Sequence, residues 1–221
     1  MSNNQTILNS IIAQGILPLF FYEDAQVSLE VTRTLYKAGV RVLEYTNRGP
    51  AAMENFKVLK KAQQQEMTEL HLGIGTIKSE QEARDFIAAG ADFIVAPIVN
   101  PAVAKIAHEH GILWCPGCMT PTEIYTAQQN GAAIIKLFPA NILGHSFLSS
   151  IKELFPGQLF MPTGGVELHT ENLGNWFKAG VCAVGLGSKL ITKDVLTKGL
   201  YDQLYNDTVK AIELVKAVKT S

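Results

Sequence analysis

The sequence predicts an α/β protein whose fold is a single-domain TIM (β/α)8 barrel with an N-terminal helix closing the barrel bottom. The first observation is a repeated junction in which a helical stretch ends at a glycine and an apolar strand follows at once. The second is the total of eight short apolar strands, five after such junctions and three others, spaced roughly 20 to 30 residues apart as β/α units are. The third is their composition, because apolar strands without clean alternation are typical of a parallel sheet buried on both faces.

The individual elements follow in chain order. The first is a helix that ends at Gly15 and has one apolar side, formed by Ile7, Leu8, Ile11 and Ile12. Apolar segments then predict strands over residues 16–20, 40–44, 71–75, 91–95, 112–114, 132–139, 158–161 and 181–184. Glycines that allow the left-handed conformation end the intervening helices at Gly39, Gly90, Gly111, Gly131 and Gly180. Capping sequences mark two helix starts, Ser79-Glu80-Gln81-Glu82 and Thr120-Pro121-Thr122-Glu123.

An open doubly wound sheet of the flavodoxin or Rossmann type has the same local pattern and stays as the alternative fold. The count of eight strands favours the barrel. No GxxxxGK[ST] or GxGxxG segment follows the first strand, which also disfavours a nucleotide-binding sheet. No linker or low-complexity segment divides the chain, so we expect one domain over residues 1–221.

The overall composition excludes several classes of function. The chain has 221 residues, 47% of them hydrophobic, and a formal net charge of -1. Its basic residues are dispersed, so we expect no nucleic-acid partner and no binding to an acidic membrane surface. No stretch is long enough to span a bilayer, and no basic segment followed by an apolar run marks a signal peptide. We therefore expect a soluble, cytoplasmic protein.

Three cysteines make a secreted disulfide framework improbable, and the spacing of two of them needs a separate interpretation. Cys115-Pro116-Gly117-Cys118 has the CxxC spacing of a redox pair or half a zinc site. No second CxxC accompanies it, so we favour a structural role in which Pro-Gly shapes the exit from the strand. His108 and His110 lie two residues apart and do not share a helix face, so we expect no metal site.

Lys136 is the candidate for chemistry, because it is the single charge in the apolar run 132–139. A buried, unpaired ammonium group tends to lose its proton, and a neutral lysine amine can form a Schiff base with a carbonyl compound. The alternative is a lysine at the end of a strand whose ammonium group reaches water.

The second predicted strand ends in Glu44-Tyr45-Thr46-Asn47-Arg48. Side chains two apart point the same way, so Glu44 and Thr46 share one side, with Arg48 at its mouth. In a barrel the carboxyl ends of all strands meet at one face, which would bring this group together with Lys136. A structural Glu-Arg pair at the end of a strand is the alternative.

Three other strand ends supply polar or glycine-rich segments. Thr76 follows Gly73-Ile74-Gly75 on the third strand. The seventh and eighth strands lead into Thr163-Gly164-Gly165 and Gly187-Ser188, the second before an expected helix. Exposed backbone N–H groups of glycines and a helix amino end attract anions, so these two loops predict a phosphate site.

Together these segments resemble, in their order, the signature of the 2-keto-3-deoxy-6-phosphogluconate (KDPG) and 4-hydroxy-2-oxoglutarate (KHG) aldolase family. The matching motifs are Glu44-Tyr-Thr-Asn-Arg48, Gly73-Ile-Gly-Thr76, Ala96-Pro97, Lys136-Leu-Phe-Pro139, Pro162-Thr-Gly-Gly165 and Gly187-Ser188. The resemblance implies class I aldol cleavage of a phosphorylated 2-keto-3-deoxy sugar acid to pyruvate and glyceraldehyde 3-phosphate, with 4-hydroxy-2-oxoglutarate as a second substrate. It also implies a homotrimer and no cofactor or metal.

The resemblance assigns roles by matching position. Lys136 would be the Schiff-base lysine and Glu44 the general acid and base. Arg48 and Thr76 would hold the substrate carboxylate, and Pro97 and Phe138 would wall the pyruvyl pocket. The distal hydroxyls and phosphate would be received by Thr163, Gly164, Gly165, Gly187 and Ser188.

The sequence departs from the family pattern at two positions. Many relatives have an arginine near the end of the first strand, where this chain has Phe20-Phe21-Tyr22, so the phosphate site lacks that charge or uses Lys189. The family's Pro-Gly pair is Pro97-Ile98 here. Thr163 in the Pro-Thr-Gly-Gly motif resembles the gluconate-type members of the family rather than the galactonate-type members. A non-catalytic phosphosugar-binding barrel and an isomerase or epimerase remain the alternative functions.

Overall fold

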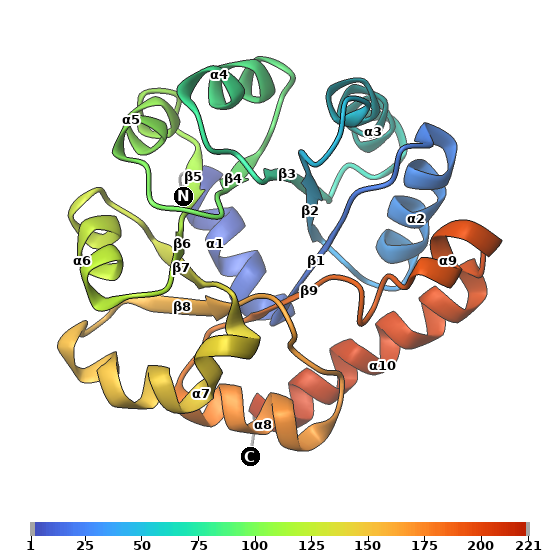
Figure 1. Cartoon of the computed structure of the whole chain (residues 1–221). Helices are drawn as coiled ribbons and strands as arrows, with labels where there is room; N and C mark the ends of the chain where they lie inside the picture. The colour runs from blue at the N-terminus through green and yellow to red at the C-terminus, as the bar shows by residue number, and fades with distance from the viewer. Residues whose placement is uncertain (1–2, 220–221) are drawn as a thin grey trace.

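A computed structural model describes residues 3–219 and has the α/β class that the sequence predicts. Its strands are β1 (Ile16–Phe20), β2 (Val42–Thr46), β3 (His71–Gly75), β4 (Phe93–Val95), β5 (Leu113–Cys115), β6 (Gly117–Cys118), β7 (Ile134–Leu137), β8 (Leu159–Pro162) and β9 (Val184–Leu186). Six of them form one parallel sheet in the order β5-β4-β3-β2-β1-β9, and three form a second, β6-β7-β8. The strands curl around a common axis, with most helices outside them (Figure 1).

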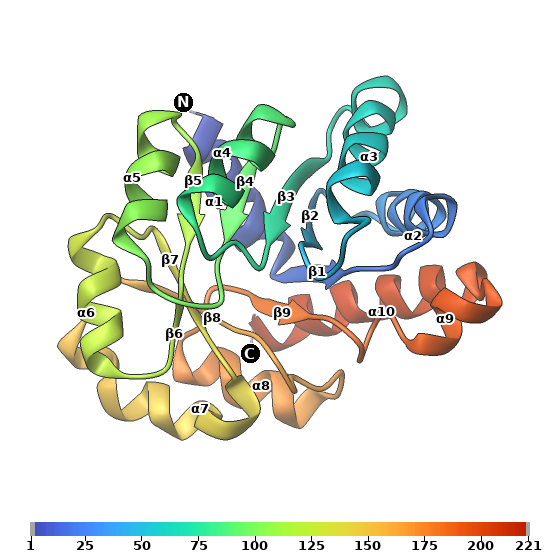
Figure 2. The ribbon, with the colours of Figure 1, turned by 45° about the horizontal axis from the view of Figure 1, so that its top comes forward.

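The helices alternate with the strands along the chain. They are α1 (Asn3–Gln14), α2 (Ala25–Lys37), α3 (Ala52–Glu66), α4 (Glu80–Ala88), α5 (Pro101–Glu109), α6 (Pro121–Gln129), α7 (Ala140–Ile151), a 3-10 turn η1 (Lys152–Leu154), α8 (Thr170–Ala179), α9 (Lys193–Lys198) and α10 (Tyr201–Lys219). Both predicted capping boxes are present, at Ser79 and Thr120. The long C-terminal helix α10 packs against α2 and α8 (Figure 2).

The strand count differs from the predicted eight because the fifth strand is divided. β5 and β6 are separated by Pro116 alone, which has no N–H to donate to a neighbouring strand. Its carbonyl still accepts a hydrogen bond from the Lys136 N–H, at 2.8 Å. The expectation that Pro116-Gly117 leads out of the strand was therefore wrong. A single parallel bridge, between Thr163 and Gly185, links the two sheets.

Most strands that follow a helix-ending glycine begin later than the sequence indicates. Gly39 has a φ of 101°, and the N–H of the next residue, Val40, donates to the Leu35 carbonyl at 3.0 Å. This bond closes the last turn of the helix, so the residue after glycine completes the helix end and does not start the strand. The same bond follows Gly90, Gly111, Gly131 and Gly180. β2 accordingly starts at Val42 rather than at residue 40.

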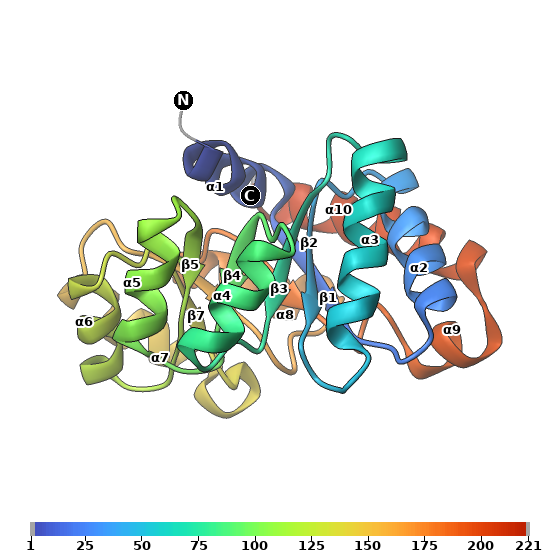
Figure 3. The same ribbon diagram turned by 90° about the horizontal axis from the view of Figure 1, so that it is seen from above.

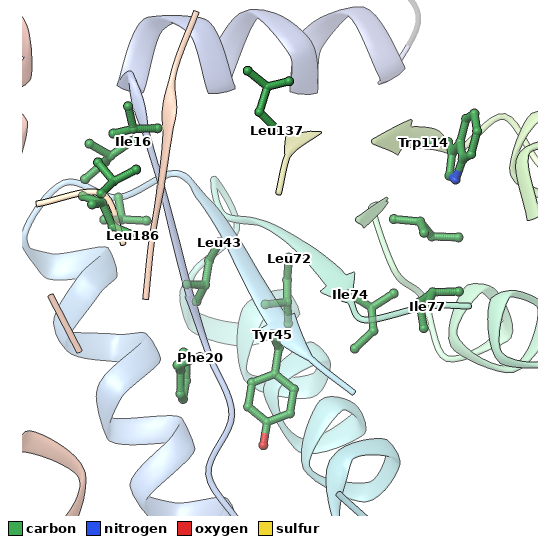
Figure 4. Close-up of a cluster of buried hydrophobic side chains, with 14 of the residues drawn as sticks. Ile16, Phe20, Leu43, Tyr45, Leu72, Ile74, Ile77, Trp114, Leu137 and Leu186 are labelled. Atoms are coloured by element: carbon green, nitrogen blue, oxygen red, sulfur yellow. The ribbon is translucent and has the colours of Figure 1, made fainter. Parts of the chain in front are cut away.

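Buried side chains form an inner and an outer cluster, and successive residues of a strand alternate between them. On β2, Val42 belongs to the inner cluster, whereas Leu43 and Tyr45 belong to the outer one. The outer cluster fills the space between strands and helices (Figure 4). On β7, Ile134 lies in the inner cluster and Ile135 in the outer. The alternation therefore directs Glu44 and Lys136 to the inner side.

Helix α1 lies at the amino ends of the strands (Figure 3). Its Ile7 and Ile11 are fully buried in the inner cluster. Gln14 ties the helix end to the sheet, because its side-chain amide donates to the carbonyls of Ile16 and Val42 at 2.7 and 2.9 Å. Within residues 3–219, no helix has both the length and the apolar character required to cross a bilayer.

We expect Asp92→Ala to destabilise the fold strongly. Asp92 accepts from Lys60 Nζ at 2.9 Å and from the Leu72 N–H at 2.7 Å, and the Lys60 side chain is only 8% exposed. Removing the carboxylate leaves a buried ammonium unpaired, which costs about 3 kcal/mol. Urea unfolding measures the change. The exposed pair of Lys198 and Asp194 gives the control, because Asp194→Ala should cost less than about 1 kcal/mol. Equal losses would contradict the prediction.

Candidate active site

Glu44 and Lys136 both lie on the inner side of the strands, near the carboxyl ends of β2 and β7. They are 1% and 4% exposed. The inner apolar cluster occupies the same side nearer the amino ends, where Val42 and Ile134 lie two residues earlier on the two strands. The structure therefore brings together the two residues that the sequence selected for chemistry.

Each of these two groups is displaced toward its neutral form. Burial lowers the pKa of the Lys136 ammonium, and Arg48 lowers it further, while Glu44 acts in the opposite direction. Burial raises the pKa of the Glu44 carboxyl, against the effects of Lys136 and Arg48. Among residues 3–219 neither group forms an ion pair or a hydrogen bond through its charged atoms. A neutral, unengaged amine is a nucleophile, and a protonated carboxyl beside it is a proton donor.

Two hydroxyls on the strand ends are also buried without a hydrogen-bond partner. They are Thr46 Oγ1, on the same side of β2 as Glu44, and Thr163 Oγ1, after β8. Buried polar groups in folded proteins nearly always have a hydrogen-bond partner, so several unpartnered oxygen atoms at the same strand ends need an explanation. A bound ligand or water between these groups would satisfy them.

Gly75 leaves the space that the Glu44 carboxyl occupies. A Cβ at Gly75 would overlap the Glu44 carboxylate and lie 2.6 Å from its Cδ. Gly73 lies two residues earlier on β3, and its lack of a side chain leaves space for the Phe93 ring. The sequence interpretation gave the two glycines no such role, although their alternation beside Glu44 is a visible signal.

We expect Gly75→Ala to lower kcat because the new methyl group must displace the Glu44 carboxyl. A shift of about 1 Å in a catalytic group typically costs about 10²-fold. Gly174→Ala is the control, since no atom lies within 4 Å of a Cβ there and the residue is in helix α8. That change should raise the free energy of unfolding by about 0.5–1 kcal/mol and leave kcat unchanged. Wild-type kcat in Gly75→Ala would contradict the placement of Glu44.

A cavity of about 260 Å³ opens beside this pair and gathers most of the other predicted residues. From the predicted set it is lined by Arg48, Phe138, Thr163, Gly164, Gly165, Gly187 and Ser188. Glu44, Lys136, Thr76 and Pro97 do not line it. Phe138 contacts both regions, since the Lys136 Nζ lies 5.0 Å from the centroid of its ring.

Thr76 and Pro97 lie at the ends of the two strands that follow β2. Thr76 has a φ of 66°, and a β-branched residue in this left-handed region is a genuine outlier of the kind found at functional sites. The backbone of Pro97 lies against Gly117, where a Cβ would come within 2.5 Å of the Pro97 carbonyl oxygen.

Two expectations about the loop after β9, at the carboxyl ends of the strands, need correction. The helix expected at Ser188 is a single turn, in which Leu190 and Ile191 donate to the Gly187 carbonyl, and α9 starts only at Lys193. The loop therefore lacks a full helix dipole. Lys189 does line the cavity, but its Nζ contacts Glu167 at 3.2 Å. The sequence gave no signal for this pair.

The CxxC cysteines are free thiols on opposite faces of the divided strand. Cys115 belongs to the inner cluster and Cys118 to the outer cluster. Burial raises the pKa of both thiols, that of Cys118 to about 12. These positions agree with the structural interpretation of the motif rather than with a redox pair.

The fold and the buried pair fit one class of protein, the α/β enzymes in which a lysine amine near the carboxyl ends of parallel strands forms a Schiff base with a carbonyl compound. A family model described as KDPG and KHG aldolase matches residues 7–206. The chain belongs to this family, and the resemblance of its motifs is confirmed.

Several individual relatives align with a large part of this chain. The 2-dehydro-3-deoxy-phosphogluconate aldolase of Dickeya dadantii is 31% identical over 206 residues, which cover 92% of this chain and 94% of that protein. The 2-dehydro-3-deoxy-6-phosphogalactonate aldolase of Escherichia coli is 34% identical over 120 residues, 54% of this chain and 58% of that one. A solved 4-hydroxy-2-oxoglutarate/2-dehydro-3-deoxyphosphogluconate aldolase is 32% identical, with a TM-score of 0.81 and coverage of 95% and 98%.

Proposed function

We propose that this protein is a class I aldolase that cleaves 2-dehydro-3-deoxy-6-phosphogluconate to pyruvate and glyceraldehyde 3-phosphate. The observation that carries the proposal is the buried Lys136 amine, whose lowered pKa and lack of an ion pair suit Schiff-base formation. The family and the Dickeya dadantii relative support the choice of substrate. The solved relative supports 4-hydroxy-2-oxoglutarate as a second substrate.

The reaction uses Lys136 and Glu44 in turn. The Lys136 amine adds to the C2 ketone, and the Glu44 carboxyl protonates the hydroxyl of the resulting carbinolamine, which leaves as water and gives an iminium ion beside a Glu44 carboxylate. Glu44 removes the proton of the C4 hydroxyl, the C3–C4 bond breaks, and its electrons pass into the iminium. Glyceraldehyde 3-phosphate leaves, and Glu44 returns the proton to C3 of the enamine that remains. Hydrolysis of the resulting imine releases pyruvate and restores the amine.

The remaining residues hold the substrate, Thr76 and Pro97 from outside the lining of the cavity and the others from within it. Arg48 binds the carboxylate, since a guanidinium offers it a bidentate fork, and Thr76 adds a hydroxyl. Pro97 and Phe138 wall the pyruvyl group. The distal hydroxyls and phosphate lie against the loops after β8 and β9, at Thr163, Gly164, Gly165, Gly187 and Ser188. No step requires a metal or cofactor.

The architecture that we propose for this chemistry is one complete (β/α)8 barrel over residues 1–221. Three observations support it: β9 pairs with β1, the Thr163–Gly185 bridge links the sheets, and β5 continues into β6. Helix α1 closes the bottom of this barrel through Ile7 and Ile11.

We also propose that the barrel assembles as a homotrimer. The family supports this assembly, and exposed apolar residues that follow strands β4, β6 and β7 are available for burial against another subunit. They are Ile98, Met119, Tyr125 and Ile142. Light scattering of the purified protein should give three times the 24.1 kDa mass of the chain. A single-chain mass would contradict the trimer.

A phosphosugar-binding barrel without catalysis is the alternative from another class. It would account for the cavity but gives no reason to bury a lysine and a glutamate there, since burial disfavours the charged form of each. A galactonate-type aldolase is the alternative within the family, supported by the partial match to the Escherichia coli enzyme.

Pyruvate release tests the function and the choice of substrate together. We expect pyruvate from the gluconate epimer with a higher kcat/KM than from the galactonate epimer, because Thr163 offers a hydroxyl to the substrate. The reverse order would assign a galactonate-type enzyme. Absence of pyruvate from both epimers and from 4-hydroxy-2-oxoglutarate would overturn the proposal.

A further inference from the structure

The cavity beside the active-site pair is lined by two cations and no carboxylate. Arg48 enters it from the loop after β2, and Lys189 enters from the loop after β9. The end of β1 contributes only the apolar side chains of Leu19, Phe20 and Phe21. Lys189 is therefore the only cation that lines the cavity on the side of the β8 and β9 loops, within the described chain.

Lys189 is held by an acidic residue that lies outside the cavity lining. Its Nζ contacts Glu167 Oε1 at 3.2 Å, and His169 Nε2 contacts the other oxygen of the same carboxylate at 2.9 Å. The side chains of Lys189 and Glu167 are 53% and 46% exposed. Ion pairs this exposed contribute little, so a dianion entering the cavity can compete with Glu167 for the ammonium group.

We propose that Lys189 determines specificity for a phosphorylated substrate, and that Glu167 restrains it while the cavity is empty. This inference rests on the proposed aldolase function and deepens it. Lys189 supplies the charge that the apolar end of β1 does not, and it binds the distal phosphate. Glu167 competes with the phosphate for the same ammonium group, so the two residues have opposite effects on affinity.

Kinetics with and without the phosphate separate the two roles. The substrates are 2-dehydro-3-deoxy-6-phosphogluconate and 2-dehydro-3-deoxygluconate, which differ only in the phosphate. Lys189→Met should lower kcat/KM for the phosphorylated substrate by about 10- to 100-fold, the loss of one charge-assisted hydrogen bond, through KM. Glu167→Gln should lower that KM by about two- to five-fold. Both variants should change kcat/KM for the unphosphorylated substrate by a much smaller factor than for the phosphorylated one.

Two controls make the result specific. Lys198→Met removes an exposed lysine of a similar ion pair, with Asp194, outside the cavity, and it should change neither substrate. Glu167→Gln should have no further effect in the Lys189→Met protein, because its benefit acts through Lys189. Equal changes for both substrates in Lys189→Met, or a raised KM in Glu167→Gln, would overturn the inference.

A binding measurement keeps this inference distinct from the aldolase assignment. Calorimetry with inorganic phosphate needs no turnover, and Lys189→Met should weaken its binding while Glu167→Gln strengthens it. Equal affinity in the parent protein and Lys189→Met, or no binding by the parent, overturns the role of Lys189 even where pyruvate still forms an adduct with Lys136. Loss of the adduct with normal phosphate binding would overturn the aldolase and leave the phosphate role of Lys189 intact.

Discussion

Replacing Lys136 with methionine is expected to abolish cleavage and leave the protein folded. Lys136 is 4% exposed and forms no ion pair among residues 3–219, so a methionine of similar length fills its space without leaving a charge unpaired. The pKa of the amine is already lowered by burial, which means that the fold gains little from the charged form. Pyruvate release measures the loss of activity, and thermal unfolding followed by circular dichroism measures the fold.

Lys60 provides the matched control for this variant. It is the other buried lysine of the described chain, at 6% exposure, but its ammonium group is paired with Asp92. Lys60→Met should therefore destabilise the protein, because Asp92 loses its cation, and leave catalysis intact in the folded fraction. Cleavage by Lys136→Met at more than a few per cent of the parent rate would show that the amine is not the nucleophile.

Replacing Glu44 with glutamine is expected to stop turnover but not imine formation. Glutamine keeps the shape of the side chain and removes the group that moves protons, a contribution typically worth about 10²–10⁴-fold in rate. Because burial raises the pKa of Glu44, the acidic limb of the parent pH profile should lie above the range of an ordinary glutamate, and this limb should disappear in the variant.

Single-turnover mixing with pyruvate separates imine formation from turnover in this variant. The imine should still form on Lys136, whereas kcat falls. Glu54→Gln, which alters an exposed carboxylate paired with Lys57, should change neither. Parent-like kcat in Glu44→Gln would remove Glu44 from the mechanism.

The sequence indicated Lys136 as the one charge in an apolar run and Glu44 by the direction of side chains along its strand, and both are local features. Glu44 and Lys136 each lie two residues from an apolar residue of the inner cluster, and this period of two is readable in the chain. The bounds of β1 and β3 agree with prediction, because each strand is a short apolar segment of the sequence. The ends of helices were harder to predict. Val40 looks like the first residue of a strand in the sequence, but its N–H donates to the Leu35 carbonyl and so belongs to the helix end.

Features that depend on contacts between distant segments could not be read from the sequence. The room that Gly75 leaves for Glu44 involves two neighbouring strands, and the ion pair of Lys189 with Glu167 joins two separate loops. The strand breaks at Pro116 because proline has no N–H to donate, and only the pairing with neighbouring strands shows that an N–H is needed at that position. The cavity excludes Lys136 and Glu44 from its lining, which motif order alone could not indicate.

Reductive trapping with pyruvate tests the central claim most directly. The protein is mixed with pyruvate and borohydride, digested, and mapped by mass spectrometry, with a sample lacking pyruvate as the control. The account predicts a stable pyruvate adduct on Lys136, formed by the parent and by Glu44→Gln but not by Lys136→Met. No adduct, or an adduct on Lys60 or another lysine in place of Lys136, would contradict it.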